Sequence, residues 1–89
     1  MTKNFIIRVY GRVQGVGFRY FTRKVAEETG VCGYVSNEYD GSVYIEAEGS
    51  EEQIELFISR VRMGPPRANV TDLRIYEGQL MNYPLFRIR

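Results

Sequence analysis

The chain has 89 residues, 44% of them hydrophobic, and a formal net charge of +1 from 12 basic and 11 acidic side chains. This composition is typical of a globular protein and argues against disorder, while the charge balance argues against a surface built mainly for nucleic acid or membranes. The sequence has no histidine and one cysteine, which excludes zinc sites built from His and Cys, Ser–His and Cys–His catalytic pairs, and an internal disulfide.

The cellular location follows from three further features. No apolar run approaches the roughly 18 residues of a membrane span, and Met1 to Asn4 lack the layout of a signal peptide. The single Cys32 fits a reducing compartment, and with no cation beside it in the sequence it is expected to be a structural thiol. We therefore expect a cytoplasmic protein with one domain over residues 1–89.

The first half of the chain predicts a strand and then a helix. Apolar and polar residues alternate over residues 4–13, as in a strand with one buried face; the side chains assigned to that face are Phe5, Ile7, Val9 and Val13. Helical spacing begins at Phe18, and Gly30 is placed to end the helix. The residues assigned to its buried stripe are Phe18, Phe21, Val25 and Ala26.

The middle of the chain predicts a hairpin and a second helix. Residues 31–37 and 42–49 have strand patterns, and an Asp-Gly pair between them is a hairpin signal. In the second of these strands Tyr44, Glu46 and Glu48 are assigned to the outer face. Ser50 and Gln53 form a capping box that opens the helix, and a Gly-Pro-Pro run ends it. The residues assigned to its buried stripe are Ile54, Phe57, Ile58 and Val61.

Residues 69–78 and 84–89 predict two last strands, the second one short. Their inward side chains are expected to be Leu73, Ile75, Phe86 and Ile88. The order β-α-β-β-α-β, followed by a short strand, predicts a ferredoxin-like α+β sandwich. We expect an antiparallel sheet of four to five strands with both helices on one face, because each helix has a single apolar stripe.

A glycine-rich loop, residues 14–18, lies between the first strand and the first helix. Gly15 and Gly17 let successive main-chain N–H groups converge on one point, and the helix dipole adds positive potential there. Arg19, in the first helical turn, adds a bidentate clamp for oxyanions. The loop therefore predicts an anion cradle, best suited to phosphate; without a Gly-Lys-Ser/Thr ending it is not a Walker loop. The alternative is that the glycines serve only the turn.

Two polar residues mark the hairpin. Asn37 stands at the end of its first strand, and Asp40 lies in the turn. Both are common turn residues, so these residues alone leave open whether Asn37 has a chemical role. For Asp40 we favour a turn residue over a catalytic base.

Four segments together resemble the acylphosphatase family. They are GRVQGVGFR at residues 11–19, GYVSNEYDGSV at 33–43, AEGSEEQIELF at 47–57 and GPPRANV at 64–70. They occur in the order of that family and cover nearly the whole chain. The first two make a specific pair, whereas either alone is a weak signal. One departure is visible: Tyr34 stands where many members have tryptophan, an aromatic exchange that leaves the motif readable.

The resemblance implies a ferredoxin-like sandwich and an enzyme that hydrolyses small acyl phosphates to a carboxylate and inorganic phosphate. It also implies roles for individual residues: Arg19 binds the phosphate and Asn37 orients the attacking water. The phosphate-binding positions that it implies are Gln14, Gly15, Val16, Gly17 and Phe18 through their amides, and Arg19 through its side chain. Free phosphate or sulfate is then expected to compete with the substrate.

Such a reaction suits a chain without histidine. The leaving carboxylate has a pKa near ~4 and needs no general acid. The reaction needs charge neutralisation around a metaphosphate-like centre and an aligned nucleophile, which Arg19, the loop amides and Asn37 would supply. We expect direct attack by water with no metal, no other cofactor and no phosphoenzyme. That the proton of the water passes to a phosphate oxygen is a hypothesis.

Two other functions compete with this interpretation. Ferredoxin-like sheets can stack RNA bases on exposed aromatic side chains; the outward positions are Tyr10, Tyr44 and Tyr76 beside the acidic Glu46, Glu48 and Asp72. The acidic neighbours favour tyrosines that only cover a solvated sheet. The second competitor is a non-catalytic phosphate-sensing module, against which the joint presence of Arg19 and Asn37 argues. We expect a monomer with a small-molecule substrate, and neither nucleic acid nor a membrane as partner.

Overall fold

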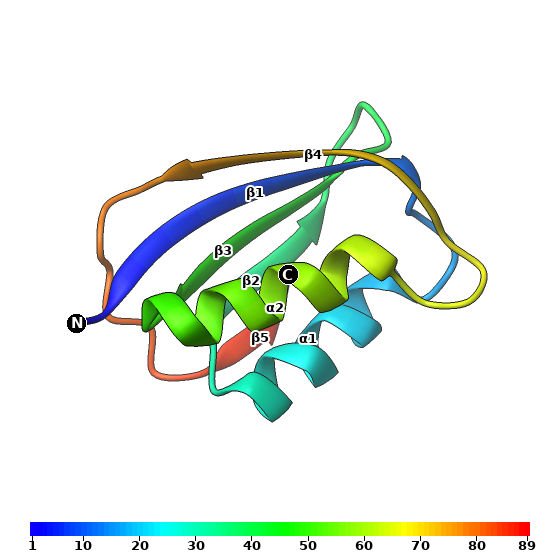
Figure 1. Cartoon of the computed structure of the whole chain (residues 1–89). Helices are drawn as coiled ribbons and strands as arrows, with labels where there is room; N and C mark the ends of the chain where they lie inside the picture. The colour runs from blue at the N-terminus through cyan, green and yellow to red at the C-terminus, as the bar shows by residue number, and fades with distance from the viewer.

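The computed structural model describes residues 1–89 and consists of a five-stranded sheet with two helices. Both helices lie against the same face of the sheet (Figure 1). Neither helix is long and apolar enough to cross a membrane. The elements in chain order are β1 Lys3–Arg12, α1 Phe18–Thr29, β2 Cys32–Asn37, β3 Val43–Gly49, α2 Glu51–Met63, β4 Asn69–Glu77 and β5 Phe86–Ile88.

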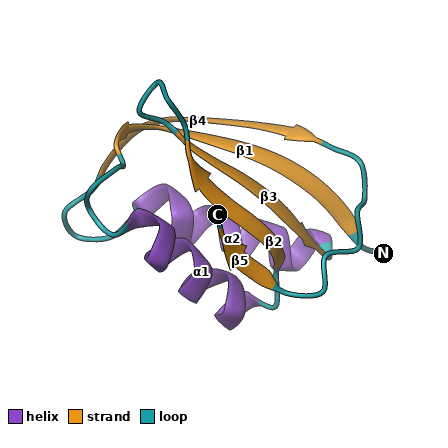
Figure 2. Ribbon diagram, turned by 180° about the vertical axis from the view of Figure 1, so that it is seen from behind, coloured by secondary structure: helices purple, strands orange, loops and turns teal.

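The strands lie in the order β4-β1-β3-β2-β5. The four longer strands pair antiparallel, with β3 between β1 and β2 and with β1 between β3 and β4. This confirms the ferredoxin-like prediction. The expectation of a purely antiparallel sheet was wrong, because β5 pairs parallel with β2. After β4 the chain crosses to the opposite edge of the sheet and reverses direction (Figure 2), and this reversal gives β5 the direction of β2.

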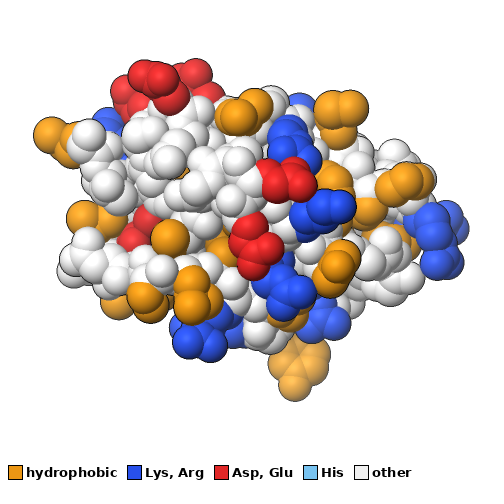
Figure 3. Space-filling view, turned by 90° about the horizontal axis from the view of Figure 1, so that it is seen from below, with side chains coloured by type: hydrophobic (Ala, Val, Ile, Leu, Met, Phe, Trp, Pro, Cys, Tyr) orange, Lys and Arg blue, Asp and Glu red, His pale blue; other side chains and the backbone are white.

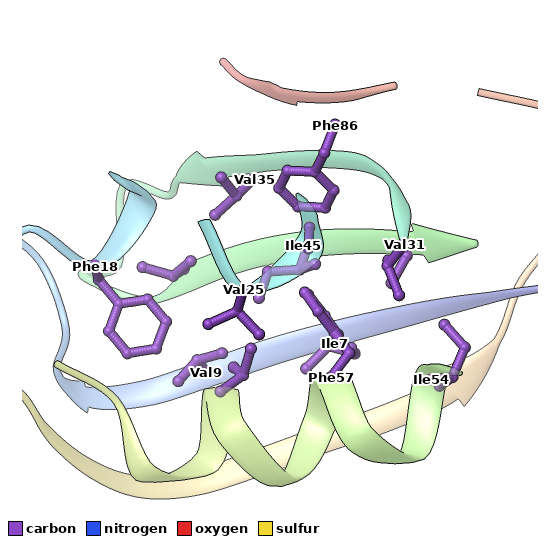
Figure 4. Close-up of a cluster of buried hydrophobic side chains, with 14 of the residues drawn as sticks. Ile7, Val9, Phe18, Val25, Val31, Val35, Ile45, Ile54, Phe57 and Phe86 are labelled. Atoms are coloured by element: carbon purple, nitrogen blue, oxygen red, sulfur yellow. The ribbon is translucent and has the colours of Figure 1, made fainter. Parts of the chain in front are cut away.

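The core lies between the helices and the inner face of the sheet. Figure 4 shows Phe18 and Val25 of α1 and Phe57 of α2 in one cluster with Ile7 and Val9 of β1 and Ile45 of β3. The apolar stripes predicted for both helices are confirmed, since their members are buried or packed against the buried cluster. The buried members are Ile7, Val9, Val13, Phe18, Val25, Ala26, Val31, Val35, Val43, Ile45, Ala47, Ile54, Phe57, Val61 and Phe86.

Ile75 does not join the core as expected. Its side chain is 38% exposed, whereas Leu73 on the same strand packs against the buried cluster. The difference arises because β4 is an edge strand, where the layer of helices gives less cover than at the centre of the sheet. The alternating pattern predicted the correct face of this strand but not how much of that face is covered.

The two helices begin differently. The capping box predicted for α2 is present: the Ser50 hydroxyl accepts a hydrogen bond from the Gln53 main-chain N–H at 3.1 Å, and the Gln53 side chain accepts one from the Ser50 N–H at 2.8 Å. The first amides of α2 are therefore partly satisfied within the chain. Helix α1 has Gly17 as its N-cap residue, which provides no side-chain hydrogen bond.

The outward, solvated position predicted for Glu48 also needs correction, because this side chain is only 3% exposed. The chain between β4 and β5 covers it, and the Glu48 carboxylate accepts hydrogen bonds from the main-chain N–H groups of Met81 at 2.6 Å and Tyr83 at 2.9 Å. The side-chain amide of Asn4 donates to the same carboxylate at 2.9 Å. These bonds fix the connection that carries the chain to β5.

Tyrosines on the outer face of the sheet surround one carboxylate. Glu46 accepts hydrogen bonds from the hydroxyls of Tyr83 at 2.8 Å, Tyr44 at 3.1 Å and Tyr34 at 3.2 Å. Burial acts to raise the pKa of Glu46, but the bonds from the tyrosines and Asn4 outweigh it and lower that pKa. Burial and the neighbouring carboxylate raise the pKa values of Tyr34 and Tyr44, and raise the pKa of Tyr83 to about 12.

The contacts of the outer-face tyrosines bear on the RNA-binding alternative. Arginine guanidinium groups lie over two of the rings, with Arg8 4.8 Å from the centre of the Tyr44 ring and Arg74 5.3 Å from that of Tyr10. These ring faces are therefore partly covered by arginine side chains of the same chain and are less available for stacking with RNA bases. On the helix face, basic and acidic side chains are interspersed (Figure 3). Neither feature favours a nucleic-acid surface.

The tyrosine cluster predicts a late alkaline titration. Tyr34, Tyr44 and Tyr83 should ionise above the pKa of a free tyrosine side chain, which is about 10. Because the folded pKa values of these three are raised, their contribution to stability is complete below about pH 10 and is lost as the pH rises through the raised values. Tyrosinate absorbance, followed while circular dichroism confirms the fold, measures this.

Glu46→Gln should move the titration of these three tyrosines to lower pH, since it removes the charge that opposes tyrosinate formation. Glu55→Gln, an exposed change on α2, is the control and should leave the titration unchanged. A titration of the folded wild-type chain with no component above the pKa of a free tyrosine, about 10, would contradict the assignment.

Candidate active site

The loop between β1 and α1 owes its shape to two glycines. Gly15 has φ 73° and Gly17 has φ 78°, values in the left-handed region that favours glycine. A Cβ atom added at either position would meet no atom within 4 Å. The glycines are therefore required by the backbone conformation and not by crowding, and they leave open space beside the loop.

The amides at the start of α1 have no partner within the chain. The first hydrogen bond of the helix runs from the Phe21 N–H to the Gly17 carbonyl at 3.0 Å, and no main-chain oxygen accepts from the amides of residues 15–20. The N-cap residue Gly17 provides no side-chain bond, and the first turn contains no acidic residue. An uncapped start of a 12-residue helix combines free donors with the positive end of the helix dipole, which attracts anions.

Arg19 extends this positive end. None of the side-chain ion pairs within the chain includes it, so no Asp or Glu side chain neutralises its charge. Its Nη1 donates to the main-chain oxygen of Arg89 at 3.3 Å. The guanidinium therefore keeps further donors for a bound oxyanion.

Tyr34, where the sequence departs from the family pattern, holds the residue that contacts Arg19. The Arg89 guanidinium lies 3.8 Å from the centre of the Tyr34 ring, a distance typical of a cation–π contact. The Arg89 main-chain N–H also donates to the Val35 carbonyl at 2.8 Å. An aromatic ring at position 34 thus holds Arg89 beside Arg19. A tyrosine ring provides this contact.

A pocket of 210 Å³ opens at the start of α1, and its lining residues are Val13, Gly15, Gly17, Phe18, Arg19, Tyr20, Asn37 and Ile88. Arg19 and Asn37, distant in sequence, therefore line one cavity. Its volume is below the roughly 300 Å³ at which sites for drug-sized ligands begin, which suits a small ligand.

The pocket differs in part from the predicted set of site residues. Val13, Tyr20 and Ile88 line it although none of them was predicted. Tyr20 could have been predicted only from its position next to Arg19 in the chain. Nothing in the sequence indicates Ile88, because it reaches the pocket through the parallel pairing of β5 with β2. The side chains of Gln14 and Val16 do not line the pocket: that of Val16 packs against the core, and that of Gln14 binds the β2–β3 hairpin.

The two polar residues of the hairpin, Asp40 and Asn37, differ in their hydrogen bonds. Asp40 Oδ1 accepts hydrogen bonds from the Ser42 hydroxyl at 2.5 Å and the Ser42 N–H at 2.9 Å, and these bonds lower the pKa of Asp40. Asp40 therefore acts as a turn residue and is a poor base. Asn37, the exposed last residue of β2, makes no side-chain bond of the kind that a turn asparagine makes to its own backbone.

No group of three or more His, Cys, Asp or Glu side chains in this structure is arranged to hold a metal ion. The lining of the pocket includes no carboxylate and no thiol. Cys32 is half-buried on β2, outside the pocket. The donors available to a ligand in the pocket are therefore main-chain amides, a guanidinium, a carboxamide and a tyrosine hydroxyl.

Comparison with known proteins places this geometry in a family. The sequence profile of the acylphosphatase family matches residues 5–88. An acylphosphatase of Archaeoglobus fulgidus is 50% identical over 82 residues, which is 92% of each chain. The crystal structure of acylphosphatase from Bacillus subtilis superposes with a TM-score of 0.95 at 41% identity, over 100% of this chain and 99% of that one.

A larger protein contains a similar unit. Full-length HypF, in its phosphate- and nucleotide-bound form, matches all of this chain with a TM-score of 0.90 at 32% identity, and the match covers 12% of HypF. The profile, the curated relative and the structural match cover nearly the whole chain and agree with one another. This chain belongs to the acylphosphatase family.

Proposed function

We propose that this chain hydrolyses the carboxyl–phosphate bond of small acyl phosphates by direct attack of water, and that it releases a carboxylate and inorganic phosphate. Membership of the acylphosphatase family supports the reaction. The observation that carries the assignment of roles is that a single pocket combines the uncapped start of α1 with Arg19 and Asn37.

The phosphoryl group is bound at the start of α1. The N–H groups of Gln14 to Phe18 and the Arg19 guanidinium face charge that spreads over the phosphoryl oxygens in the transition state. Free amides, the helix dipole and an arginine outside every side-chain ion pair support this role. The main-chain oxygen of Arg89 accepts one hydrogen bond from Arg19 and thereby orients the guanidinium.

Asn37 orients the water. Its carboxamide accepts from and donates to a water molecule without removing a proton. The water oxygen forms a bond to phosphorus, and the bond from phosphorus to the acyl oxygen breaks, so that the carboxylate leaves with the electron pair. The proton of the water passes to a phosphoryl oxygen. The pocket lining offers no carboxylate, histidine or thiol as base, and a carboxylate leaving group needs no acid.

We further infer that residues 1–89 form one catalytic domain that acts as a cytoplasmic monomer, without nucleic acid or membrane as partner. The family profile spans residues 5–88, and the free Cys32 fits a reducing compartment. Because the chain also resembles part of the larger protein HypF, one alternative function still has to be tested, that of a phosphate-binding module without catalytic activity. Turnover of a synthetic aromatic acyl phosphate by the purified chain separates the two, since a binding module would leave that substrate intact.

Arg19→Gln should abolish turnover and leave the fold intact, because the Arg19 side chain is exposed and contributes little to the core. Arg19→Lys should also fail, since a point charge does not replace a planar fork. Hydrolysis rates and circular dichroism test both. Arg62→Gln, at an exposed position on α2, is the matched control. Activity of Arg19→Gln near that of the control would remove Arg19 from the mechanism.

Asn37→Ala should lower kcat by a factor on the order of 100, typical for the loss of one preorganised catalytic hydrogen bond. The inhibition constant of phosphate should change little, because the cradle remains. If Asn37 served only the turn, alanine would instead cost about 0.5–2 kcal/mol of stability, as for a lost cap, and spare kcat. Asn69→Ala, on exposed β4, is the control for the substitution.

Chelation should leave the activity intact, because the pocket lining offers no carboxylate cluster for a catalytic cation. Inorganic phosphate and sulfate should inhibit competitively, since both present the tetrahedral oxyanion that the amides and Arg19 bind. Steady-state kinetics with EDTA and with each anion measure the two effects. Activity lost with EDTA and restored by magnesium would overturn the mechanism, and non-competitive inhibition would place the anion elsewhere.

A further inference from the structure

We propose that the Gln14 side chain is a positioning residue, which holds Asn37 in register with the phosphate-binding loop. This inference rests on the proposed function, in which Asn37 orients the water. Gln14 Nε2 donates to the main-chain oxygen of Glu38 at 2.8 Å and to that of Ser42 at 2.9 Å. Both hydrogens of the carboxamide nitrogen are thus used, and both bonds join the loop to the β2–β3 hairpin.

The two acceptors lie directly beyond Asn37, on the turn side of the β2–β3 ladder. Glu38 follows Asn37 directly in the chain, and Ser42 precedes Val43, the residue that pairs with Asn37 across the β2–β3 ladder. The Glu38 N–H donates to the same Ser42 oxygen at 2.9 Å. Gln14 therefore binds the hairpin where the β2–β3 pairing ends, directly next to Asn37, which orients the water in the proposed mechanism.

No hydrogen bond within the chain holds the Asn37 side chain itself, so its position depends on the hairpin backbone that Gln14 binds. That side chain is exposed, while the neighbouring Asp40 is held by two bonds to Ser42. The loop next to the hairpin contains Gly15 and Gly17, which have no side chains with which to contact it. The carboxamide of Gln14 is therefore the polar link that sets the distance between the bound phosphoryl group and the Asn37 carboxamide.

A purely structural role for Gln14 makes a different prediction. If Gln14 only stabilised the hairpin, its loss would lower the free energy of unfolding and would affect kcat equally with or without the Asn37 side chain. If Gln14 acts through Asn37, its loss can affect kcat only while that side chain is present. A double-mutant cycle measures this difference.

The experiment compares wild type, Gln14→Met, Asn37→Ala and the double variant, each at a temperature where it is folded. Methionine keeps the length of the side chain and the main-chain N–H but has no donor. Gln14→Met should lower kcat about tenfold in the wild-type background and less than about twofold in the Asn37→Ala background. The inhibition constant of inorganic phosphate should stay within about twofold throughout.

Gln53→Met is the matched control. It removes the capping-box partner of Ser50 and so destabilises the chain by the same substitution, away from the pocket, and it should leave kcat unchanged. Gln14→Asn provides a second test that preserves polarity: its amide is one methylene shorter and does not reach both carbonyls. It should repeat the dependence on Asn37 found for Gln14→Met.

Each contrary outcome has its own meaning. Equal losses in both backgrounds, with Asn37→Ala itself strongly impaired, would overturn the role of Gln14 and leave the proposed function standing. Near-normal kcat for Asn37→Ala would overturn the role of Asn37 and this inference with it. A loss in Gln53→Met as large as that in Gln14→Met would assign the effect to stability and would also overturn the inference.

Discussion

The uncapped start of helix α1 is the constraint on which the rest of this structure depends. A helix that leaves its first amides without partners loses stability unless an anion or water satisfies them. Here Gly17 holds that start open, and the hydrogen-bonded cap at α2 shows that the same chain caps a helix where no ligand is needed. Under the proposed function, an oxyanion bound at α1 would stabilise the fold as well as place the substrate.

The other elements bring groups to this point. β2 ends there with Asn37, and β5 reaches the same pocket with Ile88 because the chain returns across the sheet to lie beside β2. That return is held by the buried Glu48 at its start and by the contact of Arg89 with Tyr34 at its end. Polar groups on the outer face of the sheet thus determine where the last strand, and with it one wall of the pocket, lies.

The sequence allowed much of this to be predicted, and the failures have physical causes. Periodicity and capping signals act within a few residues, so the strands, helices and apolar stripes followed from them. The motif at Gly15, Gly17 and Arg19 identified one half of the pocket. The direction of β5, the exposure of Ile75 and the burial of Glu48 depend on which strands are neighbours and what covers them, and local patterns carry no information on either.

Phosphate titration followed by amide NMR tests the central claim most directly. If the start of α1 is the oxyanion site, the amide signals of residues 15–20 should shift saturably as phosphate is added, and these shifts should be largely absent in Arg19→Gln. The amides at the start of α2, whose cap is occupied by Ser50 and Gln53, should stay in place in both proteins. Saturable shifts at α2 or elsewhere, with none at residues 15–20, would contradict the account.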